Sequence, residues 1–138
     1  MEESTVNSLV SAALEARKAA YTPYSHFAVG AALLCADGTV FTGANIESAS
    51  YTPTVCAERV AFFTAVHAGK RDFTAVAVVG GPAGADVSSY CSPCGVCRQV
   101  MAEFCTPDLE VILFDGSSPR VLTLGELLPL SFGPADLA

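Results

Sequence analysis

The sequence predicts an α/β fold, a three-layer α/β/α sandwich around a mixed sheet, on the strength of two observations. Segments with strand character alternate along the chain with segments of helical periodicity. Residues 27–43 also contain two apolar runs joined at Asp37-Gly38, a dipeptide typical of a tight hairpin, so part of the sheet is expected to be antiparallel. The length of 138 residues fits a single domain, residues 1–138, with no repeat or linker.

The first half of the chain is predicted to run from a helix through a hairpin to a second helix. Residues 6–20 carry apolar side chains at helical spacing. The first strand within residues 27–43 is apolar on both faces, which indicates a central strand. After a polar loop, residues 44–54, a second helix is expected over residues 55–68, with Gly69 ending it.

The second half contains two further strands with a helix between them. Residues 73–81 and 109–114 are apolar and rich in β-branched side chains, which favours buried strands. The intervening helix is expected to begin at Ser92 and to run to about Cys105. Ser92 suits the N-cap and Pro93 the first helical position.

Near the end of the chain, Thr123 and Glu126 form a capping-box pattern that predicts a short last helix. The predicted order of elements is therefore helix, two strands, helix, strand, helix, strand, helix. This order places four strands in the sheet and leaves helices available for both of its faces.

The composition predicts self-association. Hydrophobic residues make up 51% of the chain and the mean hydropathy is +0.46. A domain of this size is expected to have more apolar surface than its own interior can bury. A second copy of the chain is the simplest cover for that surface.

Charge and cysteine usage restrict the partners and the compartment. The net charge is −7 with no run of Lys or Arg, which disfavours nucleic acid and favours a small, nearly uncharged substrate. No stretch is long and apolar enough to span a bilayer, and the first residues, MEESTVNS, are acidic, so we expect a cytoplasmic protein without membrane contact. Its six cysteines are then expected to be reduced and to bind metal or to be buried.

A metal site is predicted around the segment SPCGVCRQV, residues 92–100. Cys94 and Cys97 lie one helical turn apart, and the most plausible third ligand is Cys56, at the start of the preceding helix. Three protein ligands leave a fourth position for water, which is the pattern of a catalytic zinc site. The alternative adds Cys91 as a fourth ligand and makes the zinc purely structural. Sulfur ligands alone also leave iron open.

Glu58 favours the catalytic interpretation, because it follows Cys56 by two residues and its carboxylate could reach a zinc-bound water. The alternative is an ordinary solvated glutamate. Three thiolates around Zn²⁺ carry a formal charge of −1, which something must offset. Arg59 and Arg98 follow the ligands directly, and either could donate hydrogen bonds to the sulfurs. We expect Arg59 to tune the metal; the alternative is a surface arginine.

The combination of CAE with PCGVC resembles the signature of the zinc-dependent nucleobase deaminases. More closely, NIESASY, CAERVAFF, SPCGVCRQV and ELLPLSFGPADL are similar to segments of the small homotetrameric cytidine deaminases. The similarity runs through nearly the whole chain from the first helix onward. It implies the mostly five-stranded mixed sheet of that family.

The resemblance also implies an activity, the hydrolytic deamination of cytidine and deoxycytidine to uridine and deoxyuridine in pyrimidine salvage, with release of ammonia. Cys56, Cys94 and Cys97 would hold one zinc ion per subunit. Zinc-activated hydroxide would attack C4 of the base. Glu58 would move a proton from the water to N3 and then one to the leaving ammonia.

Contacts to the nucleoside are implied by the same resemblance. Phe27 would stack on the base, Asn45 and Glu47 would bind a ribose hydroxyl, and the main chain at Ala57 would meet the pyrimidine carbonyl. Considered alone, Phe27 is typical of a core aromatic residue, and Asn45 with Glu47 of a polar loop.

In similar enzymes neighbouring subunits complete each pocket, which implies a homotetramer with Ala49, Tyr51 and Phe132 acting in trans. The sequence departs from the common family pattern at Ser48, where asparagine is usual, and at Ala44, where cysteine is frequent. Neither position touches the expected chemistry, although Ser48 could alter how the ribose loop is braced.

The remaining cysteines, Cys35, Cys91 and Cys105, are assigned to packing. Two other functions remain open: a deaminase for a cytosine-containing nucleoside antibiotic, and a non-catalytic zinc module that uses its metal only to fold and associate. A polynucleotide deaminase is disfavoured by the acidic balance of the chain.

Overall fold

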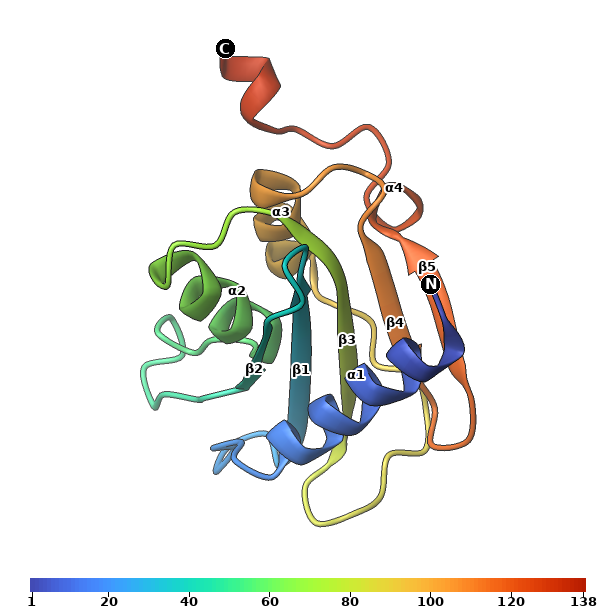
Figure 1. Cartoon of the computed structure of the whole chain (residues 1–138). Helices are drawn as coiled ribbons and strands as arrows, with labels where there is room; N and C mark the ends of the chain where they lie inside the picture. The colour runs from blue at the N-terminus through green and yellow to red at the C-terminus, as the bar shows by residue number, and fades with distance from the viewer.

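The computed structural model describes residues 1–138 and shows a five-stranded sheet with helices on both faces (Figure 1). The strands are β1 (Phe27–Cys35), β2 (Val40–Ala44), β3 (Phe73–Pro82), β4 (Glu110–Phe114) and β5 (Pro119–Thr123). Their order in the sheet is β2-β1-β3-β4-β5. Only β3 and β4 pair in parallel, and the other neighbours are antiparallel, so the predicted mixed sheet is confirmed.

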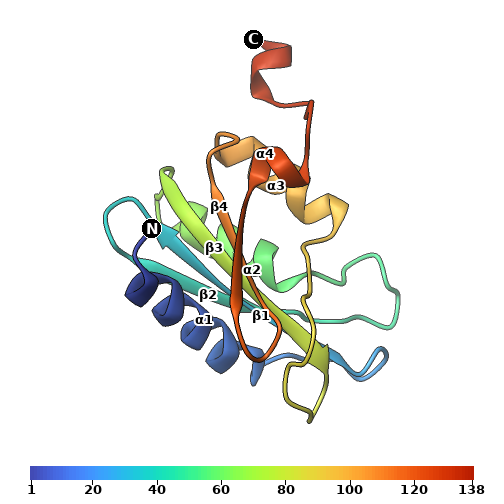
Figure 2. The same ribbon diagram turned by 90° about the vertical axis from the view of Figure 1, so that its right-hand side faces the viewer.

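The helices form the two outer layers. They are α1 (Glu3–Arg17), α2 (Ala57–His67), α3 (Gly95–Phe104) and the single turn α4 (Leu124–Leu127). Helix α1 covers one face of the sheet, while α2 and α3 cover the other (Figures 1 and 2). The predicted three-layer arrangement is therefore confirmed.

Two separate core clusters follow from the pleat of β3. Successive side chains of a strand point to opposite faces. Val76 and Val78 accordingly pack with residues of α2 and α3, whereas Ala75, Ala77 and Val79 pack with residues of α1. All five are fully buried, as expected of a strand with helices on both sides. Strand β1 lies between β2 and β3, which confirms its prediction as a central strand.

Glycines in the sheet allow the helices to approach closely. A Cβ atom built on Gly43 would lie 2.4 Å from the carbonyl oxygen of Ala57, at the first residue of α2. One built on Gly30 would lie 2.0 Å from the carbonyl oxygen of Ala13 in α1. Both distances are too short for a side chain, so the backbone of each helix rests directly on the sheet.

The start of α3 differs from the prediction. The helix begins at Gly95 with Cys94 as its N-cap, and not with Ser92 as the cap and Pro93 as the first helical residue. The Ser92 hydroxyl instead accepts a hydrogen bond from Nη2 of Arg98 at 3.0 Å, and the Pro93 carbonyl oxygen accepts one from Nε of Arg98 at 2.8 Å. Arg98 therefore holds Ser92 and Pro93 outside the helix, in the segment that precedes Cys94.

Two further differences concern boundaries and the number of strands. Helix α1 covers Glu3–Arg17, earlier than the predicted 6–20, because the N–H of Tyr21 already donates to the carbonyl oxygen of Asn45. The segment pattern missed β5, so the five strands implied by the family resemblance are correct and the four read from the pattern are wrong.

The capping box at Thr123 and Glu126 is confirmed, with both reciprocal hydrogen bonds present.

Beyond α4 the chain leaves the body of the molecule as a C-terminal arm, residues 129–138, which ends in a 3₁₀ turn at Pro134–Leu137 (Figures 1 and 2). None of the helices combines the length and apolar character needed to cross a membrane.

Candidate active site

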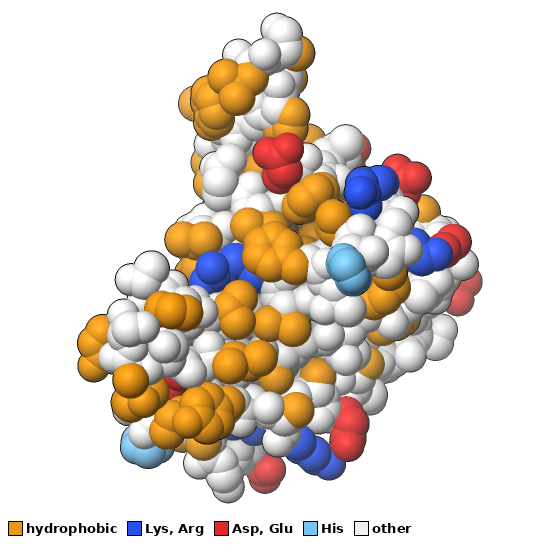
Figure 3. All heavy atoms as spheres, turned by 90° about the vertical axis from the view of Figure 1, so that its left-hand side faces the viewer, with side chains coloured by type: hydrophobic (Ala, Val, Ile, Leu, Met, Phe, Trp, Pro, Cys, Tyr) orange, Lys and Arg blue, Asp and Glu red, His pale blue; other side chains and the backbone are white.

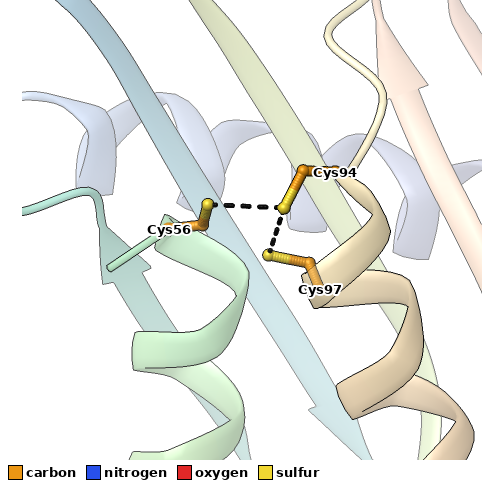
Figure 4. Close-up of side chains that lie close together, drawn as sticks. All are labelled: Cys56, Cys94 and Cys97. Carbon is orange, nitrogen blue, oxygen red and sulfur yellow. Dashed lines mark hydrogen bonds between the residues drawn. The ribbon is translucent and has the colours of Figure 1, made fainter. Parts of the chain in front are cut away.

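The structure brings together the three cysteines predicted as metal ligands, at the N-termini of two helices (Figure 4). Cys56 is the N-cap of α2, Cys94 is the N-cap of α3, and Cys97 is the third residue of α3. Sγ of Cys94 lies 3.7 Å from that of Cys56 and 3.5 Å from that of Cys97. All three sulfurs lie within 4.8 Å of one another.

The cluster fits a zinc ion. Zinc binds thiolate sulfur at about 2.3 Å in tetrahedral geometry, which puts two bound sulfurs about 3.8 Å apart. The observed sulfur separations are close to this value. Two helix N-termini also direct their positive ends toward the sulfurs, which favours thiolates there.

The thiols of the cluster differ in how easily they lose their protons. The pKa of Cys56 is lowered to about 5, chiefly because the Cys97 thiol stabilises its thiolate, with Arg59 and Cys94 adding to the effect. The pKa of Cys97 is raised, because its thiol proton is held by Cys56 and because it is buried. A divalent ion would displace the remaining protons, so metal binding at this cluster releases protons.

Cys91 stands apart from the cluster. Its Sγ packs against β3, where a Cβ built on Gly80 would lie only 2.8 Å away. Burial raises its pKa to about 11, so it remains a thiol at neutral pH. Since the metal cluster holds three sulfurs and not four, the geometry favours a site with a free fourth position over the closed structural alternative.

Glu58 is enclosed beside the cluster. It is the second residue of α2 and its exposed fraction is only 3%, so it is not the solvated glutamate of the alternative interpretation. Burial raises the pKa of its carboxyl above the ordinary value, with the negative charge of Cys56 adding to the rise. A buried carboxyl beside metal-binding sulfurs suits proton transfer.

The two arginines that follow the ligands differ in their contacts. Nη2 of Arg59 donates to Sγ of Cys56 at 3.4 Å. Arg98 does not contact a sulfur, because its guanidinium donates to Ser92, to Pro93 and to the carbonyl oxygen of Leu127 at 2.6 Å. Of the two candidates, only Arg59 is therefore placed to offset the negative charge of the thiolates.

The residues expected at the ribose are joined through the backbone to the helix that carries Cys56. Ile46, between Asn45 and Glu47, exchanges two N–H···O hydrogen bonds of 3.0 Å with Val55, the residue before Cys56. The segment that carries the two polar side chains is thereby fixed relative to the start of α2.

Asn45 also holds the start of β1. Its Oδ1 accepts the N–H of Val29 at 2.9 Å, and its Nδ2 donates to the carbonyl oxygen of Phe27 at 2.9 Å. The Phe27 side chain is 41% exposed, so it is not the fully buried core aromatic of the alternative interpretation. Phe27 and Asn45 are thus in contact at the start of β1.

Glu47 is held by residues that sequence reasoning missed. The N–H groups of Tyr24 and Ser25 donate to its Oε1 at 3.0 and 3.1 Å, and the hydroxyl of Ser25 donates to its Oε2. A surface hollow of about 380 Å³ opens here, lined by Tyr24, Ser25, Glu47, Tyr51 and Thr54. The segment YTPYSH carried no signal beyond the end of a helix, because two of these three bonds come from the main chain.

The residues expected to act in trans are on the surface of the single chain. Tyr51 is 73% exposed and Phe132 is 58% exposed, and Ala49 is exposed as well. Phe132 lies in the C-terminal arm, where its carbonyl oxygen accepts a hydrogen bond of 2.8 Å from Nε2 of Gln99. A larger hollow of about 600 Å³, between the end of α1 and residues 83–87, includes none of the predicted site residues.

Comparison with known proteins finds a matching family and relatives of similar sequence and structure. Residues 3–113 match the family described as the cytidine and deoxycytidylate deaminase zinc-binding region. A cytidine deaminase from Halalkalibacterium halodurans is 50% identical over 130 residues, which covers 94% of this chain and 95% of the relative. The crystal structure of cytidine deaminase from Burkholderia pseudomallei superposes with a TM-score of 0.84 at 47% identity, covering 96% of this chain and 100% of the other.

A more distant relative bears on the antibiotic alternative. The blasticidin-S deaminase of Bacillus cereus is 32% identical over 127 residues, covering 90% of this chain and 89% of the relative. The chain is thus more similar to the two cytidine deaminases than to the antibiotic deaminase.

Proposed function

Because the chain belongs to the family of cytidine and deoxycytidylate deaminases, we propose that it hydrolyses cytidine and deoxycytidine to uridine and deoxyuridine, with release of ammonia. The observation that carries this proposal is the burial of Glu58 at the N-terminus of α2, two residues after a cysteine of the three-sulfur cluster. A purely structural zinc has no use for an enclosed carboxyl at that position.

Cys56, Cys94 and Cys97 would hold one zinc ion in each subunit. When bound, zinc would supply Lewis acidity that makes water nucleophilic at neutral pH. Arg59 would keep its hydrogen bond to Cys56 and so offset part of the thiolate charge.

Glu58 would carry the protons of the reaction. It would take one from the attacking water and deliver it to N3 of the cytosine ring, and it would then pass one to the amino group that leaves C4. One water molecule is consumed and one ammonia molecule is released. Burial supports this role, because it raises the pKa of the carboxyl and so brings proton uptake and release closer to neutral pH.

The nucleoside would be held by residues around the start of β1 and α2. Phe27 would stack on the base, and the main-chain N–H of Ala57 would donate to the pyrimidine carbonyl. Ala57 is the first residue of α2, where N–H groups have no partner within the helix. Asn45 and Glu47 would bind a hydroxyl of the sugar.

We also propose that the active unit is a homotetramer in which Ala49, Tyr51 and Phe132 complete the pocket of a neighbouring subunit. The exposure of these side chains and the projection of the C-terminal arm away from the body support it (Figure 2). Sedimentation at the assay concentration tests this assembly, and fully active monomers would contradict it.

The proposed setting is pyrimidine salvage in the cytoplasm. Three thiolate ligands require reduced cysteines, which a reducing compartment maintains. The net charge of −7 supports a nucleoside as the partner, and not a polynucleotide.

The test follows the fall in ultraviolet absorbance of cytidine and deoxycytidine as purified protein converts them. Glu58→Gln is measured beside the wild type, and the zinc content of both is determined. We expect Glu58→Gln to keep its zinc and to lose about 10²- to 10⁴-fold in rate, because it cannot transfer protons. Glu103→Gln, an exposed position on α3, serves as the matched control and should match the wild type.

Absence of turnover of both nucleosides by zinc-loaded wild type would overturn the proposal. Turnover of blasticidin S alone would then identify an antibiotic deaminase. Zinc bound by four sulfurs, measured by X-ray absorption, would instead identify a structural zinc module.

A further inference from the structure

Ser25 connects two of the residues proposed to contact the nucleoside. Its hydroxyl oxygen accepts the N–H of Phe27 at 3.1 Å, and its hydroxyl proton is donated to Oε2 of Glu47. Its own main-chain N–H donates to the other carboxylate oxygen of Glu47 at 3.1 Å. One serine therefore contacts both oxygens of the carboxylate and the main chain of the expected stacking residue.

The direction of the Ser25 hydroxyl is determined by these contacts. A serine hydroxyl carries one proton and two lone pairs. Because one lone pair receives the N–H of Phe27, the proton remains for Glu47. The bond from the Ser25 hydroxyl is the largest of the influences that hold the pKa of Glu47 below its ordinary value, so the carboxylate is ionised and only accepts hydrogen bonds.

The carboxylate of Glu47 is nearly saturated as a result. It offers about four acceptor positions, and the N–H of Tyr24, the N–H of Ser25 and the hydroxyl of Ser25 occupy three. The amide of Asn45 has one N–H engaged with Phe27 and keeps the second. Together the two side chains can accept one hydrogen bond and donate one, which suits a hydroxyl group better than an ether oxygen.

The backbone around Ser25 is fixed from both sides. His26 has φ of 55°, an uncommon conformation for a residue other than glycine. Its N–H donates to the carbonyl oxygen of Thr22 at 3.1 Å, and its own carbonyl oxygen accepts the N–H of Ala83, the residue after β3, at 2.8 Å. Ser25 is therefore held against Glu47 by the fold, and its contact does not depend on the substrate.

We propose that Ser25 is a positioning residue for the sugar site, which orients Glu47 so that its one free acceptor position receives a sugar hydroxyl. This inference rests on the proposed function, because Glu47 must bind the sugar for its orientation to matter. Ser25 itself would not touch the reacting atoms.

The test compares Ser25→Ala with the wild type on two substrates, deoxycytidine and 2′,3′-dideoxycytidine, which lacks both sugar hydroxyls of the ring. We expect a loss of about 10-fold in kcat/KM for deoxycytidine, mainly through KM, because a hydrogen bond to a charged group is lost. For the dideoxynucleoside we expect a ratio of variant to wild type near one. Ser8→Ala, an exposed serine of α1, is the matched control.

A double variant provides the second measurement. If Ser25 acts through Glu47, then Ser25→Ala adds no further loss to Glu47→Ala on deoxycytidine, so the two losses are not additive. Equal losses of Ser25→Ala on both substrates, or additive losses in the double variant, would overturn the inference and leave the deaminase function intact. A zinc-loaded wild type that converts neither cytidine nor deoxycytidine would overturn the function itself.

Discussion

Arg59 is placed to offset the negative charge of the three-cysteine cluster. Three thiolates and a divalent ion leave a formal charge of −1, which works against ionisation of a bound water. The guanidinium contacts Sγ of Cys56 at 3.4 Å, and its buried Nε has no hydrogen-bond partner in the single chain. A guanidinium whose Nε is buried beside a sulfur is best compensated when that sulfur is a thiolate.

Arg59→Ala should therefore weaken the site in two measurable ways. Loss of a hydrogen bond to a metal ligand is expected to lower zinc affinity and the rate by about 10- to 100-fold each. Zinc affinity is measured by competition with a chelator, and the rate by the cytidine assay. Arg120→Ala, which removes an exposed arginine of β5, is the control. Unchanged zinc affinity and an unchanged rate in Arg59→Ala would show that the contact with Cys56 contributes to neither zinc binding nor catalysis.

For single residues, the sequence predicts the candidate metal ligands better than the hydrogen bonds that hold neighbouring side chains in place. Cys94 and Cys97 could be paired from their spacing, and Cys56 could be added from its place at the start of the preceding helix; the structure brings all three together. The carboxylate contacts of Ser25 could not be predicted, because they depend on the backbone path at His26. Contacts made by main-chain N–H groups leave no trace in residue type.

Among the elements, α2 has a restricted position, because it rests on β2 through Gly43. A Cβ on Gly43 would approach two backbone atoms of the helix, the oxygen of Ala57 at 2.4 Å and the nitrogen of Ala61 at 2.7 Å. Backbone atoms cannot rotate away as side chains can. The height of α2 above the sheet, and with it the position of Cys56, thus depends on the absence of one methyl group.

Gly43→Ala is expected to destabilise the fold and to move Cys56 away from Cys94 and Cys97. Forced overpacking of this kind costs about 1–3 kcal/mol in the free energy of unfolding. We expect a lower Tm in calorimetry and a reduced zinc content of the purified protein. Gly95→Ala in α3 is the control for stability, because nothing lies within 4 Å of its new Cβ. A Gly43→Ala protein with the wild-type Tm and a full zinc content would show that α2 is free to shift.

Sequence patterns predict best the strands whose side chains are buried by helices on both faces of the sheet. The strands over residues 73–81 and 109–114 are confirmed within one or two residues, because their apolar runs are required by helices on both sides. Strand β5 was missed because it is an edge strand that starts with Pro119 and has no fully buried residue. The start of α3 was misplaced because Arg98 binds Ser92, a competition that the sequence does not reveal.

The molecule as a whole exposes apolar surface that its own chain does not cover. Hydrophobic side chains gather over the face that carries α2 and on the C-terminal arm (Figure 3). Phe63 of α2 is 48% exposed, and Leu130 of the arm is fully exposed with φ of 53°. A strained, apolar residue on a projecting arm gains stability when another subunit covers it, which supports the proposed tetramer.

Shared active sites can be tested by combining two defective chains. Glu58→Gln removes the proton carrier, whereas Phe132→Ala removes an arm residue proposed to act in a neighbouring subunit. If Phe132 acts in trans, a mixed oligomer contains sites with an intact Glu58 from one chain and an intact Phe132 from another. With equal amounts of the two chains, about one quarter of the sites should be intact.

The two chains carry different tags, are produced together, and are purified through both tags in turn, so that only mixed oligomers are assayed. We expect the mixed oligomers to recover about one quarter of the wild-type rate. Each variant alone should remain far below that level, and zinc content should be full in all three samples. If Phe132 acted within its own subunit, every site would lack either Glu58 or Phe132, and mixing would restore nothing. Recovery of activity therefore distinguishes a shared site from an assembly of independent sites, which the oligomeric state alone cannot do.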